Sequence, residues 1–256
     1  MQVSPARLSQ VFLALATLDV LILQALPGKL LHATNGRLFP YRPQNFLSEM
    51  VRTQYGPWMT LAFLLLAGAA LSLAVELRRR RFREAMFVGL AGAALLALAF
   101  FPTDLADLTT DKLTCGETTR LEPCTLVGRI HNPLSTLVFA PIALCALSFC
   151  VRARFQKEWR PLSRTALLCG GLAVLGILSA TVYLRATGWE GRWWTGLMQR
   201  SLVFPALLWM AALAGSLRKK RGDGEGDDQP HREPGDEVEN RAVDVLAHDP
   251  PVVDEL

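Results

Sequence analysis

Five polar residues stand at the ends of long apolar segments, where residues distant in the sequence could act together. They precede, follow or begin four such segments: Ser48, Glu49, Asp104, His131 and Arg200. Carboxylates beside an imidazole support acid–base chemistry, and a guanidinium binds phosphate or another anion. These residue types suggest two kinds of site. One is a catalytic group with His131, Asp104 and Glu49 as candidates, and the other is a ligand-binding pocket to which all five residues contribute.

The segments that would position these residues have the length and composition of membrane-spanning helices. A helix needs about 20 apolar residues to cross the hydrocarbon core of a bilayer. Hydrophobic residues make up 51% of the 256-residue chain, and the mean hydropathy is +0.25. This composition excludes an ordinary soluble enzyme, a coiled coil and a collagen-like fibre.

The apolar runs are continuous rather than alternating, which favours helices over a β-barrel. The sequence therefore predicts an all-α polytopic membrane protein with six transmembrane helices in one bundle. The predicted spans cover about residues 8–26, 57–77, 82–101, 130–151, 165–184 and 200–217. Leu26 is followed by Pro27 with no small-x-small cleavage site before it, so the first span is expected to remain in the mature protein.

Basic residues predict how the helices are oriented. Segments 78–84 and 152–164 each hold five basic residues, and four more follow the last span at 218–221. The three other connections are longer and carry basic residues at a lower density. Because cytoplasmic loops are enriched in Lys and Arg, we expect both termini in the cytoplasm and the other three connections outside.

The composition changes abruptly after the last span. Residues 222–256 contain twelve acidic and two basic side chains and are rich in Gly and Pro. Low hydrophobicity with high net charge is typical of disorder, because little apolar surface is available to offset the entropy lost on ordering. The chain is thus predicted to divide into a transmembrane domain, residues 1–221, and a disordered cytoplasmic tail, residues 222–256.

Asp19 lies inside the first predicted span, near the centre of the membrane. A charge at that depth is unfavourable by roughly 2.5–3.5 kcal/mol on insertion scales. Two interpretations stay open: Asp19 is a buried, hydrogen-bonded acid, or it is the proton-linked acid of a channel or carrier.

The five cysteines fall into two groups. Cys145, Cys150 and Cys169 lie within spans, where cysteine behaves as a small apolar residue. Cys115 and Cys124 share one predicted outward connection, and a pair outside the cytoplasm commonly oxidises. We expect a disulfide between them, while two free thiols remain the alternative. A metal site is disfavoured because neither CxxC spacing nor clustered histidines are present.

Sequence motifs of several common enzyme classes are missing. No phosphate-binding loop, dinucleotide fingerprint, zinc-protease motif or serine-hydrolase elbow occurs in a suitable context. No cofactor is therefore expected. The basic residues are not interleaved with aromatic residues on a soluble face, so nucleic acid is disfavoured as a partner and membrane lipids are expected instead.

Four motifs, taken in order, resemble the bacterial integral membrane family called domain of unknown function 998. They are Phe-Leu-Ser-Glu at 46–49, Phe-Pro-Thr-Asp at 101–104, Gly-Arg-Ile-His at 128–131 and Gly-Leu-Met-Gln-Arg at 196–200. The resemblance covers residues 8–217. It implies a six-helix protein of the bacterial inner (plasma) membrane and implies no particular activity.

The chain departs from the family pattern at two places. Gln199 stands where the family often has Glu, which questions any role that needs a carboxylate there. Met50-Val51 replace the Leu-Gly of the family pattern.

Two functional hypotheses follow. The first is a non-enzymatic membrane protein whose outward-facing polar pocket binds a lipid headgroup or a partner, with Asp104, His131 and Arg200 as contacts and Arg200 as the anion anchor. The alternative is a membrane-embedded hydrolase or transferase that acts on a lipid-linked substrate. In that case His131 is the general acid or base, Asp104 or Glu49 orients it or acts as its partner, and Arg200 holds the phosphate.

Overall fold

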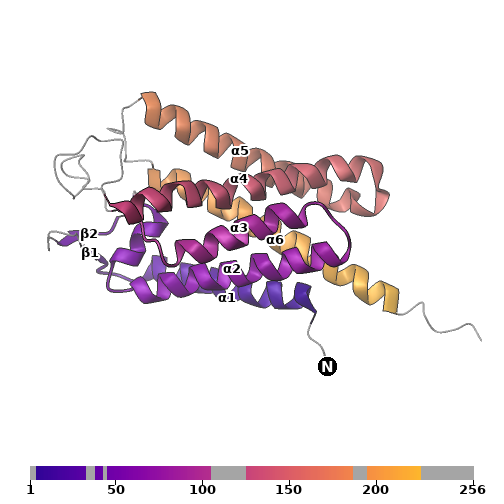
Figure 1. Ribbon diagram of the computed structural model, residues 1–256, viewed down its shortest axis with the longest axis horizontal. Coiled ribbons are helices and arrows are strands. Elements are labelled where there is room, and N and C mark those ends of the chain that lie inside the picture. Colours follow the sequence, from indigo (N-terminus) through magenta and orange to yellow (C-terminus); the bar gives the residue numbers. More distant parts are fainter. Residues whose placement is uncertain (1–3, 33–37, 43–44, 105–124, 187–194, 226–256) are drawn as a thin grey trace, which may run out of the picture. The chain divides into compact units, whose positions relative to one another are not determined.

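The structure, a computed structural model, describes residues 4–32, 38–42, 45–104, 125–186 and 195–225. Its contacts divide the chain into two compact units, Met1–Arg218 and Lys219–Leu256, and the helices pack against one another within the first. The described elements are, in order, α1 Pro5–Ala25, β1 Leu30–His32, β2 Leu38–Pro40, the 3-10 helix η1 Leu47–Arg52, α2 Gly56–Arg79, α3 Ala85–Leu98, α4 Leu126–Phe155, the 3-10 helix η2 Lys157–Trp159, α5 Arg160–Ala186 and α6 Thr195–Glu225 (Figure 1).

The α-helices follow one another as packed neighbours. α1 packs on α2, α2 on α3, α3 on α4, and α4 on α5 (Figure 1). Trp209, Leu213 and Leu217 of α6 are buried in the same hydrophobic core as residues of α1 to α4. The predicted all-α class is confirmed for the described residues, apart from one short antiparallel hairpin formed by β1 and β2.

Small residues let several of these helices approach closely. A Cβ atom built on Gly68 of α2 would lie 2.9 Å from the ring of Phe12 in α1, and one built on Gly92 of α3 would lie 2.9 Å from the side chain of Leu71 in α2. Helix pairs in membranes associate largely through such close van der Waals packing. These glycines therefore determine how near α1 and α3 can come to α2.

Large apolar side chains cover the outward surfaces of the helices. Exposed residues include Leu15 and Leu18 of α1, Leu144 of α4, and Leu168 and Leu175 of α5. In water such surfaces are unfavourable, whereas in a bilayer they contact lipid chains. The chain is built as a membrane protein.

Within the described residues, five helices are long and apolar enough to cross a membrane: α1, α2, α4, the segment Lys157–Tyr183 that contains most of α5, and the Gly196–Lys219 part of α6. The third predicted span, residues 82–101, differs, because α3 contains only 14 residues. At 1.5 Å per residue α3 is about 21 Å long, less than the roughly 30 Å of a hydrocarbon core. The turn at residues 99–101 leads to Pro102, and the residue before a proline rarely continues a helix. Six spans are therefore not confirmed.

The segment between α1 and α2 is more structured than the sequence suggested. β1 and β2 form a two-stranded antiparallel hairpin, and Leu31 also bridges to Thr53. η1 follows with four consecutive buried residues, Leu47 to Met50. The Lys29 ammonium group closes the end of α1 by donating hydrogen bonds to the carbonyl oxygens of Leu23, Gln24 and Leu26 at 2.9, 2.8 and 2.6 Å.

The five long helices each extend past at least one of their predicted bounds, and α4 and α6 are examples. α4 begins at Leu126 rather than near residue 130, because Thr125 caps it. α6 continues to Glu225, past the predicted start of the tail at residue 222. The rest of the predicted disordered tail lies outside the described residues.

Candidate functional site

Two of the sequence motifs meet at the start of α4. The Asp104 carboxylate accepts hydrogen bonds from the backbone N–H of Thr125 at 3.0 Å and from its hydroxyl at 2.6 Å. The Thr125 hydroxyl accepts in turn from the N–H of Gly128 at 3.0 Å, as an N-cap does. A helix N-terminus favours a nearby negative charge. Asp104 therefore joins the end of the α3 segment to the beginning of α4.

His131 lies one turn further along α4 and is almost completely buried, with 3% of its surface exposed. Its Nδ1 atom lies 2.7 Å from the carbonyl oxygen of Phe101. A carbonyl oxygen only accepts, so Nδ1 carries the proton and the Nε2 atom of the neutral ring is left as an acceptor. The Phe101 carbonyl thus orients the imidazole, a role that the sequence had suggested for Asp104 or Glu49.

The Glu49 carboxylate accepts hydrogen bonds at the start of η1. Its Oε2 atom accepts from the Asn45 amide at 2.7 Å and from the N–H of Phe46 at 3.2 Å. Glu49 and Asn45 are both 2% exposed. A buried carboxylate with these donors fixes the entry of the chain into η1, because it satisfies polar groups that would otherwise lack partners.

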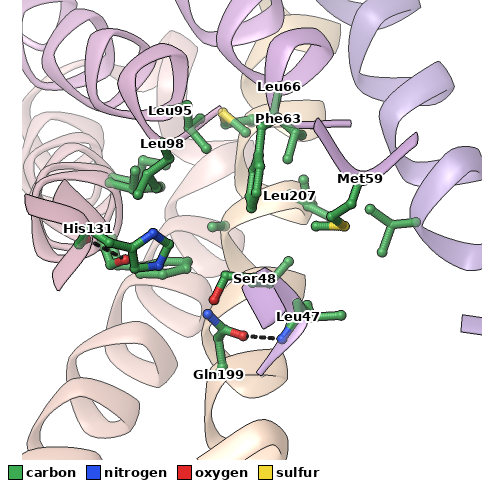
Figure 2. Close-up of a pocket in the computed structure, with 18 residues that line it drawn as sticks. Leu47, Ser48, Met59, Phe63, Leu66, Leu95, Leu98, His131, Gln199 and Leu207 are labelled. Carbon is green, nitrogen blue, oxygen red and sulfur yellow. Dashed lines mark hydrogen bonds between the residues drawn. The ribbon is translucent and has the colours of Figure 1, made fainter. Parts of the chain in front are cut away.

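Gln199 joins α6 to η1. Its Oε1 atom accepts the N–H of Leu47 at 2.6 Å (Figure 2). This contact needs only an acceptor oxygen, which a glutamate also provides. The departure from the family motif at this position therefore preserves the hydrogen bond.

Arg200, the next residue of α6, holds three parts of the chain together. Its guanidinium donates to the carbonyl oxygen of Asn45 at 3.0 Å, to the Gln24 side chain at 2.8 Å and to the Tyr41 hydroxyl at 2.9 Å. Five donors in a rigid fork suit arginine to such a junction. The guanidinium connects the ends of α1 and α6 with the segment before η1.

The positive charge of Arg200 affects two neighbouring groups in the connection after α1. Burial lowers the pKa of the Lys29 ammonium, and the Arg200 charge lowers it further. Burial raises the pKa of the Tyr41 phenol, although Arg200 and Gln24 partly oppose that rise. The Tyr41 hydroxyl stays protonated and donates to the carbonyl oxygen of Phe46 at 3.3 Å.

A cavity of about 60 Å³ lies between the start of α4, which carries His131, and the pair formed by η1 and the start of α6. Ser48, His131, Ser135 and Gln199 supply polar side chains to its lining. Figure 2 shows Ser48, His131 and Gln199 at one end of the cavity, with apolar side chains from α2 and α3 toward the other. The apolar lining residues include Phe63, Leu66, Leu95, Leu98 and Leu207.

A second cavity of about 230 Å³ lies beside the first. The two share three lining residues, Ser135, Phe139 and Gln199. The second cavity is also lined by Ile177 and Thr181 of α5, so it reaches the gap between α4, α5 and α6. Together the cavities provide a polar end within the bundle and an adjoining, mainly apolar space.

The predicted site residues all lie at this end of the bundle but have different surroundings. Ser48 and His131 line the first cavity. Glu49, Asp104 and Arg200 are instead hydrogen-bonded to the backbone segments that carry the cavity residues. Whether the five residues bind a ligand remains a prediction.

Two polar residues that line the first cavity, Gln199 and Ser135, were not predicted from the sequence. Gln199 was noted only as a departure from the family pattern, and Ser135 was not considered. Ser135 lies four residues after His131 on α4, so both lie on one face of the helix. That spacing was the available signal.

Two other predictions concern different positions. Cys115 and Cys124 lie outside the described residues, so their predicted disulfide stays a prediction. Asp19 of α1 is described, and its Oδ2 atom is buried with no hydrogen-bond partner among the described residues. No group of three potential metal ligands occurs in the described part of the chain.

Long apolar helices with lipid-compatible surfaces define an α-helical membrane protein. Residues 38–216 match the family described as Protein of unknown function (DUF998), and the chain belongs to that family. The resemblance given by the four motifs is thereby confirmed. No significant match was found among curated proteins or solved structures.

Proposed function

We propose that this protein binds an amphipathic membrane molecule without converting it. The observation that carries the proposal is the small group of polar side chains in an otherwise apolar cavity inside the bundle, namely Ser48, His131, Ser135 and Gln199. Binding sites of this kind use a few placed polar groups for orientation and apolar walls for affinity. The polar end of the ligand would occupy the first cavity, and its chain would occupy the second.

The chemistry of the lining favours an uncharged polar group as the part that is recognised. Ser48 offers a hydroxyl, Gln199 an amide and His131 an acceptor nitrogen, all of which suit hydroxyl or amide groups. Arg200 would support the site from behind rather than anchor an anion, since its guanidinium contacts Asn45, Gln24 and Tyr41.

We also propose that the protein crosses the plasma membrane of a bacterium six times, with both termini in the cytoplasm. α3 would be a short span that brings the number of crossings to six, and residues 82–84 and 99–101 would complete its length. The hydrogen bond from Arg218 to Gln10, 3.1 Å long, supports an even number of crossings because it brings the end of the apolar part of α6 beside the first half of α1. Reporter fusions at Arg80 and Cys124 test this topology; signals from one compartment would refute it.

A hydrolase or transferase for lipid-linked substrates is the alternative function. One observation favours it: Ser48 and His131 line the same cavity, and the Phe101 carbonyl orients the imidazole so that Nε2 is an acceptor. A base oriented in this way can take a proton from a hydroxyl nucleophile.

Monoolein tests both functions, because it has an uncharged headgroup, one chain and a hydrolysable ester. Purified protein would be equilibrated with radiolabelled monoolein, and both bound lipid and released oleate would be measured. Ser48→Ala and His131→Asn are expected to weaken binding about tenfold, the equivalent of roughly 1.4 kcal/mol for a lost hydrogen bond. The His131→Asn variant keeps a donor for the Phe101 carbonyl and removes Nε2.

Ser163→Ala is the matched control, since Ser163 lies at the start of α5 and bonds only to the carbonyl of Arg160 among the described residues. Oleate release that disappears in His131→Asn would establish the enzymatic alternative. Equal binding by all variants would refute the cavity as the binding site.

A further inference from the structure

We propose that the end of the bundle opposite the cavity is a binding surface for anionic phospholipid headgroups. Four parts of the chain bring basic residues to this end. They are the last turn of α2 with the segment before α3, the end of α4, the start of α5, and the end of the Met1–Arg218 unit in α6. This inference concerns a second site and does not depend on what occupies the cavity.

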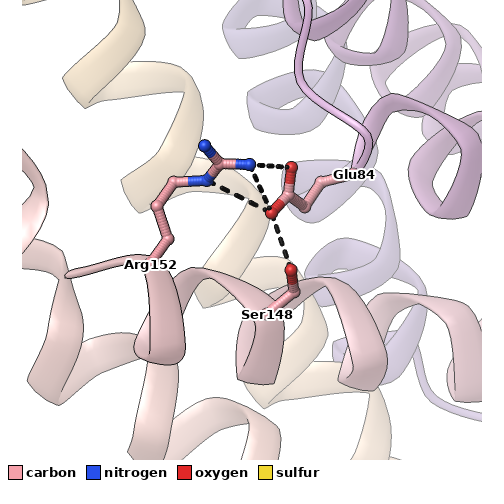
Figure 3. Close-up of polar contacts among 3 residues, drawn as sticks. All are labelled: Glu84, Ser148 and Arg152. Atoms are coloured by element: carbon pink, nitrogen blue, oxygen red, sulfur yellow. Dashed lines mark hydrogen bonds and ion pairs between the residues drawn. The ribbon is translucent and has the colours of Figure 1, made fainter. Parts of the chain in front are cut away.

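Direct contacts place these segments side by side. The Arg80 guanidinium donates to the carbonyl oxygen of Leu217 at 2.8 Å, which joins the end of α2 to the Leu217 turn of α6. Glu84, before α3, forms an ion pair with Arg152 of α4 at 2.9 Å (Figure 3). Their basic residues therefore form one surface, called here the arginine surface.

Nine exposed basic residues make up the arginine surface: Arg78, Arg79, Arg81, Arg83, Arg154, Lys157, Arg160, Arg164 and Arg218. Within the described part of the Met1–Arg218 unit, Glu158 is the single exposed acidic residue at this end. A surface with such an excess of one sign of charge attracts ligands of the opposite sign.

The two other carboxylates at this end do not neutralise the surface, because each is committed to a less exposed arginine. Glu84 is 2% exposed and accepts from Arg152 and Ser148, the latter at 2.6 Å (Figure 3). Glu76 pairs with Arg80 at 3.0 Å. Neither carboxylate is therefore paired with any of the nine exposed cations.

The backbone conformation of Arg81 is a second observation in favour of the binding surface. Its φ angle is +59°, and within the described residues it is the one non-glycine residue with a positive φ. Glycine adopts that conformation with less strain, and helices often end on a glycine there. An arginine at this position keeps a positive charge on the surface at the expense of local backbone strain.

The position of the surface favours lipid over an acidic protein partner. Val75 and Val151 are exposed within a turn of the arginines, and Phe155, next to Arg154, is 82% exposed. Apolar side chains at this level contact hydrocarbon, whereas neighbouring arginine side chains extend toward the headgroups. The cations are therefore held at the depth of lipid phosphates, where anionic lipids attract them.

Co-purification from a defined lipid mixture tests the proposal. Full-length protein would be incubated in detergent with equimolar phosphatidylglycerol and phosphatidylcholine, isolated, and its retained lipids quantified. We expect more phosphatidylglycerol than phosphatidylcholine, and less enrichment at high salt because ions screen exposed charges. The triple substitution Arg79→Gln, Arg83→Gln and Arg154→Gln is expected to reduce the enrichment about threefold or more.

Arg42→Gln is the control, because Arg42 is an exposed arginine at the cavity end; its enrichment should match that of the unsubstituted protein. Thermal unfolding of each variant establishes that it is folded. Equal retention of both lipids by the unsubstituted protein would overturn the proposal, as would an enrichment that the folded triple variant keeps unchanged. Neither result would bear on monoolein binding in the cavity.

Discussion

The carboxylate of Asp104 occupies the space that a Cβ atom on Gly128 would need. The same carboxylate is hydrogen-bonded to Thr125, the N-cap of α4. Two sequence motifs that are far apart in the chain are therefore parts of one arrangement, in which glycine leaves room for the acid that secures the helix. His131 follows on the next turn and faces the cavity.

Gly128→Ala is expected to lower the free energy of unfolding by about 1–3 kcal/mol, as overpacking of a well-packed site does. The measurement is thermal or denaturant unfolding of the purified variant. Gly171→Ala in α5 is the control, since a Cβ atom there meets no other atom within 4 Å. Alanine in a helix should leave that variant equally stable or stabilise it by up to about 1 kcal/mol. Equal effects of the two substitutions would contradict the close contact with Asp104.

The spans of this chain were predictable because each is a continuous apolar run whose length the bilayer dictates. α3 was the exception, since apolar composition continues to Phe101 while the helix ends at Leu98. The hairpin and η1 were not foreseen because their order depends on distant partners such as Gln199 and Arg200. Local sequence carries little information about such contacts.

Gln199→Leu removes the acceptor for the Leu47 N–H and should destabilise the protein by about 1–3 kcal/mol, the loss expected when a partly buried donor has no partner. Gln199→Glu retains an oxygen acceptor on a side chain of the same length. The free energy of unfolding of this variant should therefore stay within about 1 kcal/mol of that of the unsubstituted protein. Unfolding in detergent compares the three proteins. If the Glu variant were as unstable as the Leu variant, the amide NH₂ rather than its oxygen would be the important group.

The common depth of the predicted site residues followed from their places at span ends, whereas their separate roles did not. The sequence cannot distinguish a carboxylate that faces a cavity from one that caps a helix, because both stand beside a span. Asp104 and Glu49 satisfy nearby backbone N–H groups, while Ser48 faces the cavity. Rotation around the helix axes decides this, and uniformly apolar helices give only weak information about rotation.

Arg81→Gly should stabilise the protein by about 1 kcal/mol, because glycine adopts the left-handed conformation at this position without a Cβ clash. Arg78→Gly provides the comparison, because this substitution removes the same charge. Arg78 lies within the last turn of α2, where glycine should destabilise the protein by up to about 1 kcal/mol. Calorimetric unfolding measures both. A destabilised Arg81→Gly variant would mean that the arginine side chain contributes more to stability than the strained backbone removes.

Tyr41→Phe removes the hydroxyl that accepts from Arg200 and should destabilise the protein near neutral pH by about 1–2 kcal/mol. The folded pKa of Tyr41 is raised, chiefly by burial, so this contribution is present below the unfolded tyrosine pKa of about 10. It is lost as the pH rises through the folded value. The stability difference between the unsubstituted protein and Tyr41→Phe should therefore shrink as pH rises above about 10. A stability difference that stays constant with pH would contradict this coupling between Tyr41 ionisation and folding. Tyr55→Phe is the comparison.

Glu84 and Arg152 are expected to be the most strongly coupled pair at the arginine-rich end. Arg152 contacts both carboxylate oxygens of Glu84 (Figure 3). Its guanidinium also lies 4.6 Å from the centre of the Phe82 ring. Removing one partner of a largely buried pair leaves a charge without compensation, so Glu84→Gln and Arg152→Gln should each destabilise by about 3–5 kcal/mol. The double variant should lose clearly less than the two effects combined. Additive losses in unfolding experiments would show that the two residues stabilise the protein independently and that the ion pair does not hold α3 to α4.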